Sequence, residues 1–112
     1  MSSEVKVVAR QLDIAAGAKD STELFKNEEA KVFVLKKAVF QASSGALFNV
    51  FASLRVGAED LIEGSKEVTA DTAPLTLDFN KQLQSGESIT LVYRNADTAN
   101  PYKLQVILVL EG

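Results

Sequence analysis

The chain has 112 residues, of which 46% are apolar and 24% are charged, and its formal net charge at pH 7 is -3. This length suits one folded domain, residues 1–112, because single hydrophobic cores are usual at about 100 to 150 residues, and the composition excludes a disordered chain. The small negative charge provides no basic field for a phosphate backbone, so nucleic acid is not an expected partner.

The N-terminal segment carries two predicted strands. In "EVKVVARQLDIAAG", Val5 and Val7 alternate in one phase and Leu12 and Ile14 in the other, so the pattern predicts a strand with a slip in phase. We expect the strand within residues 1–15 to lie at a sheet edge or to be exchanged with another chain. The segment "STELFKN" predicts a second, short strand.

The segment "KVFVLKKAVFQASSG" predicts a strand with a bulge. Phe33 and Leu35 share one phase, whereas Ala38 and Phe40 share the other. One extra residue near Lys36-Lys37 returns the later side chains to the core face, which is the effect of a β-bulge.

The next segment, "LFNVFASLRV", fits two secondary structures. Leu47, Phe51 and Leu54 match one stripe of a helix. However, every second residue from Phe48 to Val56 is apolar, and the β-branched and aromatic content favours a pleated surface. We therefore predict a strand.

A tight turn and a polar loop follow. Gly57-Ala58 predicts a two-residue hairpin turn into "EDLIEG", in which Leu61 and Ile62 suit a short partner strand. Residues 65–73, "SKEVTADTA", form the longest polar connection and are expected to be a surface loop.

Three further strands are predicted by strict alternation in "PLTLDF", "GESITLVYRN" and "PYKLQVILVLEG". Their apolar rows are Leu75, Leu77 and Phe79; Ile89, Leu91 and Tyr93; and Tyr102, Leu104, Val106, Leu108 and Leu110. About eight short strands separated by turns, with no helical pattern between them, indicate an all-β fold, a single antiparallel β-sandwich or a barrel. We expect the sandwich.

The side chains that carry most enzyme chemistry are missing. The chain has no histidine and no cysteine, which removes the common general base, the common metal ligands and the Cys/His and Ser/His pairs of hydrolases. The acidic residues Glu28-Glu29, Glu59-Asp60, Asp71 and Asp78 are expected to be solvated, and strand neighbours point to opposite faces. We predict no catalytic, cofactor-binding or metal-binding residue and no enzyme activity.

Two of the predicted strands are apolar on both faces. A sandwich strand normally keeps one face polar, yet the last strand places Ile107 and Val109 opposite its apolar row. Leu47 and Phe51 lie opposite the row of the "LFNVFASLRV" strand in the same way. Either a segment of the same chain or a partner must cover these side chains.

The N-terminal strand offers a further contact surface, because its valines can add a strand to the open sheet edge of a neighbour. The predicted interface therefore consists of Val5, Val7, Val8, Leu47, Phe51, Ile107 and Val109.

The sequence carries no recognisable targeting or membrane segment. The start, "MSSEVKVVARQLD", lacks the basic region and apolar core of a signal peptide, and no apolar run approaches the ~20 residues of a membrane helix. We expect a soluble protein made in the cytoplasm and not inserted into a membrane.

Three long segments carry a family resemblance: "EAKVFVLKKAVFQASS", "LFNVFASLRVGAEDLIEG" and "APLTLDFNKQLQSGESITLVYRNADTANPYKLQVILVLEG". Their order of strand, "VGAEDLIEG" hairpin, "L-x-x-G-E-x-I" turn and final strand resembles small jelly-roll modules of the structural proteins of tailed phages and archaeal viruses. The resemblance covers about residues 30–112. It implies a jelly roll and a virion component such as a capsid decoration, spike, fibre or adaptor, usually oligomeric and often trimeric, with no universal functional residues.

We therefore expect a non-enzymatic structural protein of a virion, assembled in the host cytoplasm from copies of itself and other structural proteins. The alternative is a lectin-like module that binds a carbohydrate or another small ligand through loops at 43–47, 65–73 and 95–101. The lack of tryptophan disfavours this alternative, because sugar rings stack on flat aromatic side chains.

Overall fold

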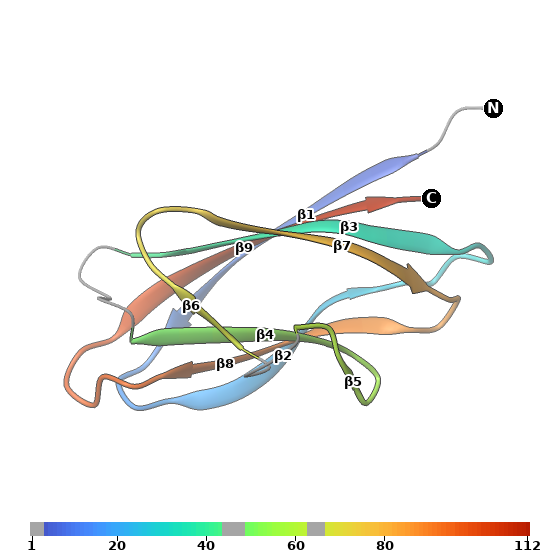
Figure 1. Cartoon of the computed structure of the whole chain (residues 1–112). Coiled ribbons are helices and arrows are strands. Elements are labelled where there is room, and N and C mark those ends of the chain that lie inside the picture. Colours follow the sequence, from blue (N-terminus) through green and yellow to red (C-terminus); the bar gives the residue numbers. More distant parts are fainter. Residues whose placement is uncertain (1–3, 44–48, 63–66) are drawn as a thin grey trace.

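The computed structural model describes residues 4–43, 49–62 and 67–112. Within these residues the chain forms nine β-strands and no helix. The strands make two antiparallel sheets that pack face to face, one of four strands and one of five (Figure 1). The predicted all-β sandwich is therefore confirmed.

The four-stranded sheet has the order β1-β9-β3-β7, and its strands are β1 (Val5–Ile14), β9 (Tyr102–Glu111), β3 (Phe33–Ala42) and β7 (Leu75–Leu83). The five-stranded sheet has the order β2-β8-β4-β5, and its strands are β2 (Lys19–Lys26), β8 (Ser88–Asn95), β4 (Val50–Val56), β5 (Glu59–Asp60) and, also paired with β4, β6 (Val68–Ala70). In Figure 1 the chain after β6 crosses from the lower sheet to the upper one and enters β7.

The strand pairing is that of a jelly roll. β1 pairs with β9, β2 with β8, β3 with β7, and β4 with β5 and β6, so the chain is a long ribbon of nested hairpins. Hydrogen bonds between β3 and β9 and between β4 and β8 roll this ribbon into two sheets. This is the double-sheet arrangement of jelly rolls, as the resemblance implied.

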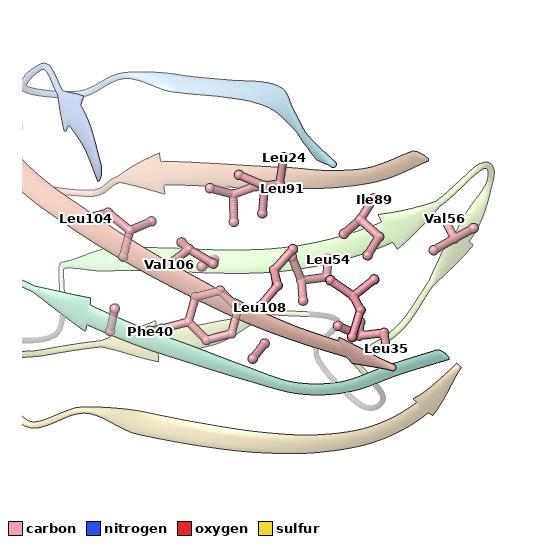
Figure 2. Close-up of a cluster of buried hydrophobic side chains, with 14 of the residues drawn as sticks. Leu24, Leu35, Phe40, Leu54, Val56, Ile89, Leu91, Leu104, Val106 and Leu108 are labelled. Atoms are coloured by element: carbon pink, nitrogen blue, oxygen red, sulfur yellow. The ribbon is translucent and has the colours of Figure 1, made fainter. Parts of the chain in front are cut away.

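The core lies between the sheets and is built from the predicted apolar rows. Figure 2 shows Leu104, Val106 and Leu108 of β9 in one cluster with Leu54 of β4 and Leu91 of β8. A fully buried apolar side chain of this size contributes about 1.5–3 kcal/mol, so these rows hold the sheets together. The largest fully buried side chains are Phe33, Phe40, Ile14, Leu35, Leu54, Leu83, Ile89, Leu91, Leu104, Leu108, Leu110 and Val50.

β3 carries the predicted bulge at Lys36-Lys37. The register of β3 against both of its neighbours shifts between Leu35 and Lys37. Leu35 before the shift and Ala38 after it are both fully buried. The extra residue therefore keeps both halves of the strand facing the core, as the two apolar phases indicated.

The predicted slip in phase does not occur in β1. The register of β1 against β9 is continuous along all ten residues of the strand. Leu12 and Ile14 face the core, whereas Val5 and Val7 point outward and keep 58% and 64% of their surface exposed. The prediction was wrong because two alternating valines give the same sequence pattern whether their side chains face the core or the solvent.

The hairpin that follows β4 agrees with the prediction at its turn and differs beyond it. Val56 pairs with Glu59 across the two-residue turn Gly57-Ala58, and Gly57 has a φ of 59°, a left-handed conformation that favours glycine. However, β5 contains only Glu59–Asp60, and Leu61 and Ile62 lie beyond its end.

The predicted surface loop at 65–73 contains a strand. Val68–Ala70 forms β6, in which Ala70 pairs with Val50 of β4 and is fully buried. Composition hid this strand, because three residues with only one large apolar side chain give too short an alternation to recognise. β4 therefore has β8 on one side and the short strands β5 and β6 on the other.

Candidate interaction face

An apolar patch occupies the outer face of the four-stranded sheet. Val7 of β1 pairs with Val109 of β9, and Ala9 of β1 pairs with Ile107, which also pairs with Val39 of β3. Paired residues on one face of a sheet are in side-chain contact range. We call this surface the valine face and define it by Val5, Val7, Ala9, Val39, Ile107 and Val109.

Exposure is uneven across the valine face. Val5 and Val7 belong to the edge strand β1 and are well exposed, so no described segment of the chain covers them. Ile107 and Val109 lie on β9 between β1 and β3 and are half-buried, because strands on both sides shield them. They are not part of the core, and their remaining surface faces outward.

A row of uncharged polar side chains borders the valine face. Gln105 of β9 pairs with Gln11 of β1 on one side and with Gln41 of β3 on the other. The three glutamines therefore cross the sheet side by side, two residue pairs from Ile107 and next to it on the same face. Protein interfaces commonly combine an apolar centre with a polar rim of this kind.

Charged pairs mark the two ends of the same face. Asp13 pairs with Lys103 beyond the glutamine row. At the opposite end, Lys37 lies beside Val109, and its Nζ is 4.0 Å from Oδ1 of Asp78. Glu111 of β9 lies opposite Val5 at this second end. Both ends of the valine face thus carry acidic and basic side chains, while its centre carries neither.

The free edge of β1 is less suited to a partner than the face beside it. Lys6 and Arg10 occupy the inward phase of this strand, where they pair with core residues of β9. Lys6 donates a 2.9 Å hydrogen bond to Glu29, which raises the pKa of the Lys6 ammonium. Inward-pointing charges on an edge strand are a common obstacle to the addition of another strand.

Four of the seven residues predicted for the interface meet on this surface, namely Val5, Val7, Ile107 and Val109. Val8 lies in the inward phase and packs against the core, and Phe51 lies on the other sheet. Leu47 is outside the described residues. Sequence reasoning missed Ala9 and Val39, although both share the outward phase of their strands.

Phe51 has a partner within the chain. It lies on the outer face of the five-stranded sheet, opposite Arg94 of β8, and the guanidinium carbon of Arg94 is 3.8 Å from the centre of its ring. A cation over an aromatic face at this distance is attracted by the ring. The ring is therefore partly shielded without a second chain.

A hollow of about 330 Å³ lies on the same outer face, and we call it the Ser53 hollow. Ser53 of β4 and Val92 of β8 pair across the two central strands and form its floor. Its lining residues are Lys19, Ser53, Arg55, Asp60, Glu67, Val92, Tyr93 and Arg94. The sequence analysis did not identify it, although the outward phase of β4 and β8 contains Ser53, Arg55 and Arg94.

Two arginine–carboxylate pairs line the Ser53 hollow. Arg94 donates two hydrogen bonds to Glu67, at 2.6 Å and 3.1 Å, and this contact lowers the pKa of the Glu67 carboxyl and raises that of Arg94. The Nε of Arg55 lies 3.2 Å from Oδ1 of Asp60, without the alignment of a hydrogen bond.

The loop at 95–101 is held together by its own polar groups. The buried Asn95 amide donates to the carbonyls of Ala15 and Asn100, and Asp97 accepts a 2.5 Å hydrogen bond from the Tyr102 hydroxyl. This bond, with others from the backbone and Asn100, lowers the pKa of Asp97 to about 2. Of the other two loops proposed for a ligand, residues 44–47 and 65–66 lie outside the described residues.

The candidate carboxylates do not converge. Glu59 forms an ion pair with Lys81 of β7, whereas Asp60 pairs with Arg55 of β4. Among residues 4–43, 49–62 and 67–112, no group of three or more His, Cys, Asp or Glu side chains is placed to hold a metal ion. No helix that could cross a membrane occurs in that part of the chain either.

No protein-family model matches the chain, and no curated protein matches it. Among solved structures, chains of infectious bursal disease virus of the Gt and Gx strains match with TM-scores of 0.57 and 0.56, each at 11% identity. These matches cover 97% and 99% of this chain but only 32% and 33% of the viral chains, so the chain spans about a third of their length. A crystal structure of FLHE matches with a TM-score of 0.55 at 10% identity, over 99% of this chain and 96% of that one. At such identities the similarity shows a shared fold.

Proposed function

We propose that this protein is a non-enzymatic structural protein that associates with copies of itself through the valine face. The observation that carries this proposal is the exposure of Val5 and Val7 beside the outward-facing Ile107 and Val109. Contiguous exposed apolar side chains with a polar rim are typical of protein–protein contact surfaces.

The charges on the valine face favour a second copy of the chain as its binding partner. Both ends of the face carry acids and bases, with Asp13 and Lys103 at one end and Lys37, Asp78 and Glu111 at the other. A twofold axis at the centre places opposite ends over each other. Each charged end of one copy then lies over a charged end of the other that carries both signs, so acids and bases can pair while the uncharged centres lie together.

The particle that such contacts build is, in this proposal, a virion that also contains other structural proteins. The jelly-roll topology and its similarity to chains of infectious bursal disease virus support this setting. A shared fold does not by itself determine function, so the experiment tests the self-association contact directly.

The test substitutes lysine at an exposed position of the valine face. Val7→Lys places a charge where the contact is apolar, and burying an unpaired charge is costly, so we expect self-association to weaken by roughly 30-fold or more. Val7 is well exposed, so the variant should keep the wild-type far-UV circular dichroism. Light scattering over a range of concentrations measures the mass.

Ser21→Lys is the matched control, because Ser21 is an exposed strand residue on the outer face of the other sheet. It should assemble as the wild type does. A wild-type protein that stays monomeric at every concentration, or a Val7→Lys variant with the wild-type mass, would reject the proposal.

A further inference from the structure

The Ser53 hollow contains buried groups that lack a hydrogen-bond partner. Only 6% of the surface of Ser53 is exposed, and its Oγ has no hydrogen-bond partner. The Nε of Arg55 is also buried without a hydrogen bond, although it forms an ion pair with Asp60 at 3.2 Å. Buried polar groups are nearly always hydrogen-bonded, and an exception calls for an explanation such as a functional role or a bound water or ion. Both groups belong to side chains that line the same hollow.

Each of these groups can donate a hydrogen bond. The Nε–H of Arg55 can only donate, and the Ser53 hydroxyl can donate or accept. Lys19 adds an ammonium group, whose charge helps to lower the pKa of Glu67. No direct hydrogen bond of the Lys19 ammonium occurs within the described residues. The carboxylates of Glu67 and Asp60 already contact Arg94 and Arg55. The partner that fits the hollow is therefore an acceptor.

The charges of the lining residues indicate how many negative charges that acceptor carries. Lys19, Arg55 and Arg94 are cationic, whereas Asp60 and Glu67 are anionic, which leaves one positive charge in excess among the described lining residues. One carboxylate balances this charge, and hydrogen bonds from cations to a carboxylate are among the strong ones.

We propose that the Ser53 hollow binds a small organic molecule through a single carboxylate group. The Lys19 ammonium pairs with the carboxylate, and the donors of Ser53 and Arg55 hydrogen-bond to it. Val92 provides an apolar surface for the rest of the molecule. The site lies on the sheet opposite the valine face, so it is distinct from the self-association proposed above.

D-glucuronate and D-glucose test this proposal, because they differ by one carboxylate. In amide nuclear magnetic resonance spectra we expect glucuronate to shift the signals of Ser53, Val92 and the Arg55 Nε–H in a saturable way, and glucose to leave them unchanged. Lys19→Gln and Ser53→Ala should each weaken glucuronate binding by about tenfold. Both changes leave the core intact, because Lys19 is exposed and the Ser53 hydroxyl has no partner to lose.

Lys26→Gln is the control, since Lys26 is an exposed lysine at the other end of β2 that does not line the hollow. It should bind glucuronate within about twofold of the wild type. Four results would overturn the proposal: no saturable shift with glucuronate, equal binding of glucose, tighter binding of inorganic phosphate, or an equal loss in Lys26→Gln and Lys19→Gln.

Discussion

At the scale of single residues, Asp97 shows how a short polar turn is fixed. Its carboxylate accepts hydrogen bonds from the Tyr102 hydroxyl, from the Asn100 side chain and from the backbone N–H of Ala99 and Asn100. Hydrogen bonds to the charged form of an acid favour that form. The pKa of Asp97 therefore falls from 3.8 to about 2, with the Tyr102 bond as the largest cause.

This depressed pKa predicts a loss of stability in acid. The carboxylate stabilises the fold fully above its unfolded pKa, and this contribution is lost as the pH falls from about 4 through about 2. Asp97→Asn should therefore be less stable than the wild type at pH 7, and the two should converge toward pH 2. Denaturant unfolding at a series of pH values measures the difference.

Two further variants make this test specific. Tyr102→Phe should bring the pKa of Asp97 back toward 3.8, which carbon nuclear magnetic resonance of the side chain can follow. Asp20→Asn changes an exposed aspartate of β2 and should keep the acid-dependent loss of the wild type. A wild-type Asp97 that titrates near 3.8 would contradict this account.

At the scale of single elements, the bulge of β3 decides which side chains enter the core. Phe33 and Leu35 precede it, Ala38 and Phe40 follow it, and all four are fully buried. Side chains alternate between faces with a period of two, so a strand without the extra residue can present only one of the two pairs to the core.

Deletion of Lys36 should therefore cost far more than its substitution. The deletion turns either Phe33 and Leu35 or Ala38 and Phe40 outward, and we expect at least ~3 kcal/mol of lost stability, since each large buried side chain contributes about 1.5–3 kcal/mol. Lys36→Ala removes only a surface hydrogen bond to Asn80 and should cost less than about 1 kcal/mol. Guanidinium unfolding distinguishes the two, and equal stabilities would show that the strand can shift its register at little cost.

At the scale of the whole molecule, the two proposed surfaces lie on opposite sheets of the sandwich. The valine face belongs to β1, β9 and β3, and the Ser53 hollow to β4, β8 and their neighbours, with the apolar core between them. Packed sheets are about 10 Å apart, so each surface can be occupied without contact with the other.

This separation predicts that the two activities are independent. Val7→Lys should leave the affinity for D-glucuronate within about twofold of the wild type, and Lys19→Gln should leave the mass of the assembly unchanged, because additivity holds for sites without shared contacts. Titration of each variant, together with light scattering, measures both. If Val7→Lys weakened glucuronate binding strongly, the ligand would have to bind where two copies meet.

The sequence by itself determined the long strands after β2, most of their inward faces and the bulge at Lys36-Lys37, because a period of two is a local property of an extended chain. It missed β6, which is too short to show that period. It also identified Ile107 and Val109 as outward-facing, from the same alternation. It could not decide whether Val5 and Val7 face the core or the solvent, since the two orientations give the same alternation in the sequence.

Only the tertiary structure decided which outward residues lie together. Val39 joins Ile107 because β3 and β9 are neighbours, although they are distant in sequence. The Ser53 hollow forms because Asp60 of β5 and Glu67, next to β6, lie beside β4. Strand order is set by long-range packing that no local pattern encodes, and both proposed surfaces depend on it.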